Sequence, residues 1–517
     1  MFNDNFTFSE NIFYKLLFAS NAFIDFKTDI LFMEFDDKNE VKESLSRLKW
    51  VFMQLKLESQ YGRNALSEIR PYKNDEVLEL RSNFIELGHI IEVFKARTSL
   101  FSALNGIFKE LRYICGSINN LKKNLVLGET ELFEIKNFAI LVSDLLESAR
   151  KEDILPEYFI NCDLKPIIQI LNPDNIVTRS FYIHEFWSDK LKEIRESKKI
   201  LESKILAAKD SHEKEELRSK RAEIVVLERE EELEVRKKLT LKLKEYESVL
   251  DFAAKNIGLY ELTLAKAEIA VENNCCLPEI YDSDSNKPIL LEMAIEPEIA
   301  ESLKKSGMDF TPVSIEVQKG VTLLTGANMG GKSVALKTLA LNTELVRFGF
   351  MPFALKMSLK IPEFVKVISG DQQNALQGLS SFGAEIVELT ELLEKLEKSS
   401  GLAVCDELGR STNPYEGSRF VQALSDRLQS SSSYGIIATH YDGIKTDGAA
   451  YYQVAGLRAL LDKEVKEKSF SCNNLNKYMD YHLIKTSETS IVPREALKIG
   501  TLLGLPDRFI QSLKKLY

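Results

Sequence analysis

The 517-residue sequence contains no run of 18 consecutive apolar residues, so it offers no candidate transmembrane helix. Its first five residues, M-F-N-D-N, lack the basic segment and the apolar core of a secretory signal peptide. The six cysteines show no C-x-x-C spacing. This pattern favours reduced thiols over a disulfide framework or a zinc site and predicts a cytoplasmic protein with no membrane partner.

An excess of positive charge is also absent, because the formal net charge is −10. An acidic chain binds DNA only through a local basic patch, since the field of the whole molecule repels phosphates. Hydrophobic residues make up 44% of the chain and charged residues 28%, as in ordinary globular proteins. The length suffices for about three domains.

The first half of the chain reads as helical and carries no chemical motif up to about residue 185. Glu, Lys and Leu then dominate residues 187–272. A polar stretch at 209–212 predicts a hairpin turn between an outgoing helix and a returning helix over 213–272, roughly 90 Å long if unbroken. The returning helix has a 4-3 repeat typical of packing against a partner helix, formed by Leu239, Leu243, Tyr246, Leu250, Ala253, Ile257, Tyr260 and Leu264. A lever arm and an ordinary solvated helical pair both remain open.

The helical hairpin also carries lysines that could line DNA: Lys190, Lys192, Lys198, Lys199, Lys237, Lys238 and Lys242. Glutamates are interleaved with them, and this pattern favours a solvated helix face. A polar break follows at 273–287, and from about residue 288 short strands alternate with helices. That alternation predicts an α/β nucleotide-binding domain.

Residues 326–333 read G-A-N-M-G-G-K-S and fit the phosphate loop G-x-x-x-x-G-K-[ST]. A β-prone run precedes this loop and a helical pattern follows it, as the motif requires. Backbone N–H groups of such a loop surround phosphates at a helix N-terminus. Lys332 is expected to reach the β- and γ-phosphates, and the Ser333 hydroxyl to bind Mg²⁺. The alternative is a glycine-rich turn that binds nothing. The expected nucleotide contacts are Gly326, Ala327, Asn328, Met329, Gly330, Gly331, Lys332, Ser333 and Val334.

An apolar strand at 402–405 ends in Asp406 and Glu407, a Walker B arrangement. Asp406 is expected to hold Mg²⁺ through water, and Glu407 to polarise the attacking water. Two adjacent carboxylates suit these separate tasks. A chance Asp-Glu pair after an apolar strand is the alternative.

A third strand over 434–439 ends in His440, which could sense the γ-phosphate or be merely structural. The segment 378–383, G-L-S-S-F-G, precedes another helix. It reads either as an ordinary helix cap or as an ABC-type signature. In the second reading Ser380 acts in trans on the γ-phosphate bound by the opposite subunit, and hydrolysis requires a dimer.

These motifs together resemble the ATPase domain of the MutS family. Residues 325–333 are similar to that family's T-G-P-N-M-G-G-K-S, residues 406–412 to D-E-I-G-R-G-T, and residues 438–441 to A-T-H-Y. The resemblance is strong over about 310–517. It implies an ATP- and Mg²⁺-dependent ATPase that works as a homodimer, with adenine stacked on Phe310 and dimerising helices near the C-terminus.

The sequence departs from that family in several places. Ala327 stands where proline is usual, and Ser411 where glycine is usual. The turn at 209–212 is too short for the family's DNA clamp. The tripeptide at 32–34, F-M-E, matches the mismatch-reading wedge only in isolation. A short member is expected, without the mismatch-reading domain, the clamp or the small nuclease domain.

The expected fold class is a mixed one: an all-α N-terminal core with a long helical hairpin arm, then an α/β ABC-type P-loop ATPase domain. The expected divisions are a helical core at 1–186, the arm at 187–275, the ATPase at 276–490 and C-terminal dimerising helices at 491–517.

Three function classes follow from the resemblance. The first is a dimeric ATPase that hydrolyses ATP to ADP and phosphate to open and close helical arms, related to DNA repair and recombination proteins but not reading mismatches itself. The second is an ATP-dependent remodeller of a protein client, such as a reactivase for an adenosylcobalamin-dependent aminomutase. The third is a structural dimer that binds ATP without turnover, and Glu407 argues against it.

Overall fold

The computed structural model describes residues 38–173, 183, 185–282, 285–326, 330–369, 381–457, 479–487, 496–502 and 504–516. They fall into two compact units built from separated stretches of chain. The helical unit comprises Lys56–Glu68 and His89–Ala265, and the sheet unit takes the remainder. Two of the four boundaries between the units fall inside continuous helices, α5 and α12. The fourfold division along the sequence stays a prediction.

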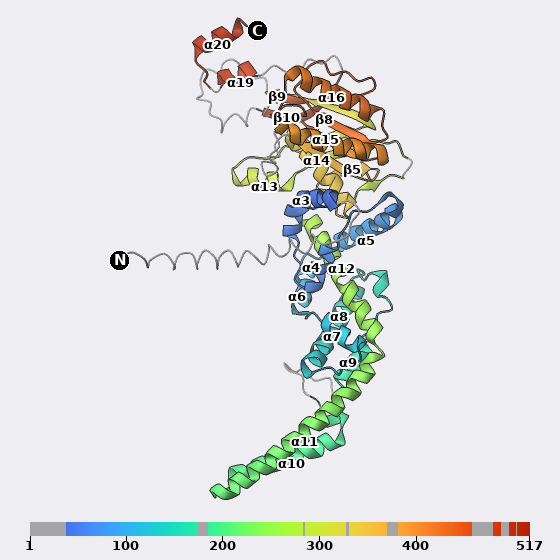
Figure 1. Cartoon of the computed structure of the whole chain (residues 1–517), viewed down its shortest axis with the longest axis vertical. Helices are drawn as coiled ribbons and strands as arrows, with labels where there is room; N and C mark the ends of the chain where they lie inside the picture. Colours follow the sequence, from blue (N-terminus) through green and yellow to red (C-terminus); the bar gives the residue numbers. More distant parts are fainter. Residues whose placement is uncertain are drawn as a thin grey trace, which may run out of the picture. The chain divides into compact units, whose positions relative to one another are not determined.

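The described residues of the helical unit lie mainly in helices (Figure 1). Its elements are α4 (Gln60–Ser67), the second half of α5 (Val77–Ala96), α6 (Leu100–Glu110), α7 (Cys115–Lys122), α8 (Glu129–Lys151), η3 (Glu157–Phe159), α9 (Lys165–Leu171), η4 (Glu185–Trp187), α10 (Asp189–Ala207), α11 (Ser211–Lys244) and most of α12 (Glu247–Glu272).

The predicted hairpin turn is confirmed, because α10 ends at Ala207 and α11 starts at Ser211. The Asp210 side chain caps α11 by accepting the backbone N–H of Glu213 at 3.1 Å. The two helices run side by side (Figure 1). We call this pair of helices the arm.

The returning helix over 213–272 is not continuous, because a turn at residues 245–246 separates α11 from α12. The N–H groups of Glu245 and Tyr246 bond to carbonyls three residues back, so the helix tightens and ends. Lys244 donates to the Leu121 carbonyl of α7 at 2.8 Å, which holds this end in place. The 4-3 repeat still lies inward: Leu243 and Leu250 are fully buried on either side of the turn.

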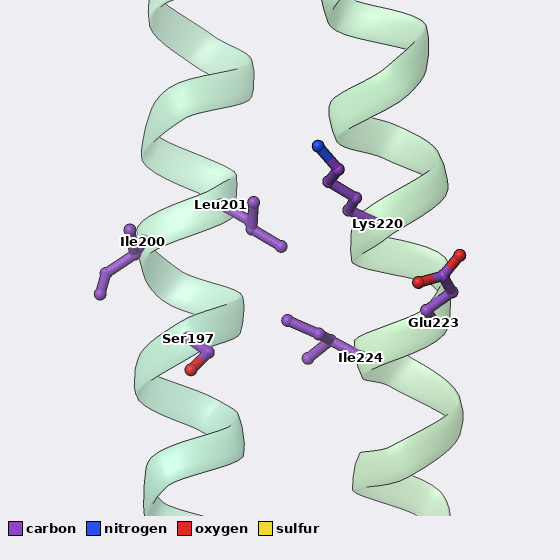
Figure 2. Close-up of a pocket in the computed structure, with 6 residues that line it drawn as sticks. All are labelled: Ser197, Ile200, Leu201, Lys220, Glu223 and Ile224. Carbon is purple, nitrogen blue, oxygen red and sulfur yellow. The ribbon is translucent and has the colours of Figure 1, made fainter.

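A shallow hollow lies between α10 and α11, lined by Ser197, Ile200, Leu201, Lys220, Glu223 and Ile224. Figure 2 shows Leu201 and Ile224 directed toward each other across it, while Ile200 and Glu223 point away. It carries no cluster of groups that would bind a ligand, and we assign it no function.

The sheet unit contains two sheets. Its helices are α3 (Lys38–Gln54), η2 (Asn74–Glu76), the first half of α5, the end of α12, α13 (Pro297–Lys305), α14 (Lys332–Arg347), α15 (Ser381–Lys398), α16 (Pro414–Gln429), α19 (Ala496–Leu502) and α20 (Asp507–Lys514). Its strands are β1 (Glu279–Ile280), β2 (Ile289–Ala294), β3 (Val313–Val317), β4 (Gly320–Thr325), β5 (Lys356–Leu359), β6 (Val365–Ser369), β7 (Leu402–Asp406), β8 (Tyr434–Ala438), β9 (Ala450–Leu457) and β10 (Met479–Thr486).

The larger sheet has the order β10-β9-β4-β8-β7-β6, with β10 antiparallel and the other strands parallel. The smaller sheet has the order β1-β5-β2-β3. Residues of α15 and α16 form an apolar core with the larger sheet (Figure 1), including Leu392, Leu424, Leu428, Ala403 and Ile437. Parallel strands buried in this way read as continuous apolar runs, as β7 and β8 do.

Helix α3 is fastened to the end of α14 by a buried polar cluster. Glu344 accepts the Ser44 hydroxyl at 2.6 Å, Arg47 at 2.8 Å and Arg347 at 2.9 Å. Burial alone would raise the pKa of Glu344, but the two arginines outweigh it and lower that pKa.

None of the described helices combines the length and the apolar character needed to cross a membrane. Within the described residues, Cys115, Cys162, Cys275, Cys276 and Cys405 are free thiols.

Candidate nucleotide-binding site

The carboxyl ends of three parallel strands bring the predicted site residues to one edge of the larger sheet. Leu324 near the end of β4 and Asp406 at the end of β7 both pair in register with Ala438 at the end of β8. The phosphate loop follows β4, the acidic pair ends β7, and His440 follows β8. Ligands in open α/β sheets bind at such an edge.

The phosphate loop turns sharply into α14 at two glycines. Gly326 has φ 142° and Gly331 has φ 92°, both in the region that favours glycine. Gly331 occupies the N-cap of α14 and Lys332 is its first residue. The N-terminal N–H groups of this helix therefore face the loop, as an anion site requires. Ala327, Asn328 and Met329 lie outside the described residues.

Lys332 folds back over the loop and is 4% exposed. Its ammonium donates to the Gly326 carbonyl at 2.9 Å and lies 3.7 Å from a Glu407 oxygen. Burial lowers the pKa of Lys332, and the carboxylates of Glu407 and Asp406 act in the opposite direction. The lysine thus links the loop to the acidic pair.

Glu407 has a left-handed backbone with φ 53°. That conformation costs a residue other than glycine of the order of 1–3 kcal/mol, and it persists where the surroundings hold it. Its N–H donates to the Ala438 carbonyl at 3.0 Å, and its carboxylate accepts Arg410 at 2.9 Å. Strain of this kind clusters at functional sites, and here it turns Glu407 toward Lys332.

Residues 407–412 form a loop that is supported by α15, by Tyr441 and by α16. Gly409 donates its N–H to Glu385 of α15 at 2.8 Å, and Ser411 donates its hydroxyl to the same carboxylate. Tyr441 donates to the Gly409 carbonyl at 2.8 Å. A Cβ at Gly409 would lie 2.7 Å from Gly417 Cα in α16, so the backbones of these two segments are in close contact. Sequence reasoning missed the contacts of Glu385 and Tyr441, because they join residues 24 to 32 positions apart in the chain.

His440 has an exposed side chain beside Tyr441, with ring centroids 4.2 Å apart. Partial desolvation lowers the pKa of its imidazole, which favours the neutral form at pH 7. The preceding residue, Thr439, donates its N–H to the Leu324 carbonyl at 3.0 Å. The structure thus fixes this segment next to the strand that enters the phosphate loop.

The remaining predicted site residues lie around the start of α14, before β3, or outside the described residues. Ser333 and Val334 lie half-buried in the first turn of α14, and Gly330 is buried just before it. Phe310 is half-buried between α13 and β3, three residues before that strand, and its stacking on adenine stays a prediction. Ser380 lies outside the described residues, directly before α15.

Tyr481 is a neighbour of the phosphate loop that sequence reasoning did not find. It stands in β10 at an irregularity of the pairing with β9, between Asp480 and Leu483. A Cβ at Gly331 would lie 2.9 Å from its ring. Burial raises the pKa of Tyr481. The sequence held no signal for this contact, because 150 residues separate the two positions.

The donors at this edge fit a nucleoside triphosphate with Mg²⁺. A helix N-terminus behind glycine suits phosphate, and the lysine adds a positive charge. Mg²⁺ is ordinarily held by one or two carboxylates, water and phosphate oxygens, and Asp406 with Ser333 could supply the protein's share. Within the described residues, no cluster of three or more His, Cys, Asp or Glu side chains is placed to hold a metal ion.

Comparison with known proteins identifies the same region. The family model for MutS domain V matches residues 322–515. Three similar proteins bear the name Endonuclease MutS2. The protein from Fusobacterium nucleatum is 32% identical over 306 residues, 58% of this chain and 36% of that protein. That from Aquifex aeolicus is 30% identical over 218 residues, 40% and 28% respectively. That from Clostridium tetani is 29% identical over 232 residues, 43% and 28%.

The matched part of the chain spans about a third of the length of these relatives. It contains the strands, the phosphate loop and the acidic pair that carry the predicted site. Residues 322–515 of this chain therefore match MutS domain V, and the chain is similar to the MutS2 proteins.

Proposed function

We propose that this protein hydrolyses ATP to ADP and phosphate at the edge formed by β4, β7 and β8. The observation that carries the proposal is the position of Lys332, buried between the loop carbonyl of Gly326 and the carboxylate of Glu407. A buried cation beside a strained acidic residue, at a helix N-terminus, suits phosphoryl transfer to water. Similarity to an ATPase family supports the assignment.

Each residue has one task in this proposal. Lys332 exchanges its present partners for the β- and γ-phosphate oxygens, and Ser333 and Asp406 hold Mg²⁺, which neutralises charge on those oxygens. Glu407 orients the attacking water and accepts its proton. His440 senses the γ-phosphate as a neutral donor.

The proposal includes a composite site in a homodimer. Ser380 and the N-terminus of α15 act in trans on the nucleotide bound by the other subunit, and residues 491–517 contribute to dimerisation. Family resemblance supports both statements. Opening and closing of the dimer would move the helical arms, which act as levers on a client.

The nature of the client is the second part of the proposal. Three of the seven arm lysines that could have contacted DNA are engaged with glutamates: Lys190 with Glu231, Lys198 with Glu228, and Lys237 with Glu234. Lys242 lies over the Trp187 ring at 4.7 Å. This engagement favours a protein client over DNA at the arm, while similarity to the MutS family favours DNA repair or recombination.

Steady-state ATPase activity tests both parts. Wild-type protein is expected to hydrolyse ATP, and Lys332→Ala to lose at least about 100-fold in turnover, because transition-state charge loses its counter-ion. Equal hydrolysis by the two proteins would refute the site. Adding duplex, mismatched and branched DNA at low and physiological salt then separates the clients. Stimulation that survives physiological salt indicates DNA, and indifference to every DNA indicates a protein client.

A further inference from the structure

One side of α11 carries a row of cations. The row begins at Lys214 and includes all four arginines of this helix, at successive spacings of four, three, eight and seven residues. Residues at such spacings recur on one side of a helix, and these extend over roughly 33 Å. We call them the cationic row: Lys214, Arg218, Arg221, Arg229 and Arg236.

Much of the cationic row is open to solvent. Arg218 and Arg229 are exposed, and the other three members are half-buried. Arg221 donates to Glu202 of α10 at 2.7 Å, and Arg218 lies 4.0 Å from Glu215, at the limit of an ion pair. Within the described part of the chain, the remaining three members form no salt bridge. The row therefore holds more positive charge than its own neighbours neutralise.

The opposite side of α11 has the opposite character. Lys220 on that side is paired with Glu216 at 2.8 Å, and Glu223 and Glu234 recur on the same side without a second arginine. Interleaved charges of this kind are typical of a solvated helix face. Charge is thus segregated around α11, and the arginines are confined to one side.

An apolar row runs beside the cationic row. It consists of Ala222, Val226 and Leu233, which are all exposed and lie four and seven residues apart. Ala222 directly follows Arg221, so the apolar row is turned about 100° around the helix from the cationic row. α11 contains no aromatic residue on which bases could stack. Cations beside exposed aliphatic side chains match a partner helix with carboxylates and aliphatic residues better than a phosphate backbone.

We propose that the cationic row and the apolar row of α11 together dock an acidic amphipathic helix of a protein client. Guanidinium groups bind carboxylates in a planar, bidentate geometry, so the arginines pair with acidic residues on one flank of the partner. Aliphatic residues on its adjacent flank cover Val226 and Leu233. This inference rests on the protein client of the proposed function and names the chemistry of that client.

Fluorescence anisotropy of a labelled synthetic peptide tests the docking on the full chain. The peptide has about 22 residues, enough to span the cationic row as a helix, with glutamates on one flank and leucines on the adjacent flank. Wild-type protein is expected to bind it. Arg218→Gln with Arg229→Gln should weaken binding about 10-fold at low salt and less at physiological salt. Val226→Gln with Leu233→Gln should weaken it about 10-fold at both salts, because apolar contact is not screened.

Matched changes on the opposite side of α11 control for charge and folding. Lys220→Gln with Lys238→Gln removes the same charge and should change the affinity by less than about 2-fold. Glutamine is a good helix former, so every variant should keep its helices, which circular dichroism checks. A peptide of the same composition in scrambled order should bind about 10-fold more weakly, because its charges and leucines form no aligned flanks.

Equal binding of the scrambled peptide, or an equal loss in the control variant, would indicate unspecific attraction of charge and overturn the docking site. No binding of the peptide by wild-type protein would overturn it too. Duplex DNA that binds at physiological salt, with a loss in the arginine variant and none in the variant at Val226 and Leu233, would assign the row to nucleic acid instead. Lys332→Ala should bind the peptide as wild type does, so absence of ATP hydrolysis would refute the proposed ATPase separately from this result.

Discussion

At the scale of single residues, the site depends on backbone positions that few side chains tolerate. Gly331 has φ 92° at the N-cap of α14, and Glu407 has φ 53° after β7. Gly331 requires glycine because its φ is positive and because a Cβ at this position would meet the Tyr481 ring. Glu407 has a strained backbone, and its carboxylate lies 3.7 Å from the Lys332 ammonium, as the proposed role requires.

Gly331→Ala is expected to destabilise the protein by about 1–3 kcal/mol, since the new Cβ combines an unfavourable φ with a contact 2.9 Å from the Tyr481 ring. ATP binding should weaken as the loop N–H groups tilt away. Fluorescent nucleotide titration and thermal melting measure the two effects. The double variant with Tyr481→Ala should regain part of the stability, because it removes the contact but not the strain. No gain would mean that the ring is not the obstacle.

Lys266 provides a prediction about pH. Burial lowers the pKa of this lysine from its usual 10.5 to about 7. Its ammonium lies 4.4 Å from the Phe350 ring centroid and donates to the Phe348 carbonyl at 3.3 Å. Between pH 7 and 10.5 the unfolded chain binds this proton and the folded chain does not, so the free energy of unfolding rises with pH over that range.

Lys266→Met should therefore raise the free energy of unfolding at pH 7 by about 1–3 kcal/mol and remove that rise. Denaturant melts at pH 6.5, 8 and 9.5 provide the measurement, with Lys255→Met on the exposed side of the same helix as the control. A stability of the Lys266→Met variant that still climbs in parallel with wild type would show that another group titrates there.

At the scale of elements, the arm is held together by a charged layer inside an otherwise sparse apolar contact. Glu228 of α11 accepts Arg195 at 3.1 Å and also Lys198, both from α10. Burial alone would raise the pKa of Glu228, but Lys198 and Arg195 outweigh it and lower that pKa. Such a layer fixes the register of two helices when its members are paired.

Glu228→Ala should loosen the arm by about 1–3 kcal/mol, because it leaves two cations without their shared partner in a half-buried layer. Hydrogen exchange of peptides from α10 and α11 reports the opening of the hairpin. Glu230→Ala on the exposed face of α11 is the matched control and should change little. Equal exchange in both variants would mean that the layer does not stabilise the hairpin.

At the scale of the whole molecule, the compact units do not follow the order of the sequence. Both units are assembled from separated stretches, and α5 and α12 each belong partly to one and partly to the other. Helix α3, early in the chain, is bonded to the far end of the helix that starts at the phosphate loop. The sheet unit therefore includes residues on both sides of the helical unit in sequence, and truncation at either side would remove part of its core.

Glu407→Gln is expected to bind ATP, fail to hydrolyse it, and accumulate as a dimer of twice the 58.8 kDa chain mass. Removing the proton acceptor blocks turnover while the loop and Lys332 remain. Light scattering after gel filtration, with and without ATP and Mg²⁺, measures the mass. Lys332→Ala is the control and should keep the nucleotide-free mass under both conditions. Wild-type rates of hydrolysis by Glu407→Gln would exclude this residue as the base.

The sequence by itself determined the phosphate loop, the acidic pair, the strands that precede them and the hairpin turn at 209–212. These features depend on residues close together in the chain, where spacing and periodicity act directly. Ser380 and Phe310 remain predictions, since their tasks depend on a partner subunit or a bound nucleotide.

Tertiary structure alone decided the rest. The Tyr481 ring lies against Gly331, Glu385 binds the 407–412 loop, and a turn at 245–246 divides a helix whose repeat continues through it. Each outcome depends on contacts between distant segments. Spacing and periodicity within a short stretch of sequence cannot predict such contacts. Tertiary packing determined which distant residues are in contact, while the local sequence determined the helices, the strands and the motifs they carry.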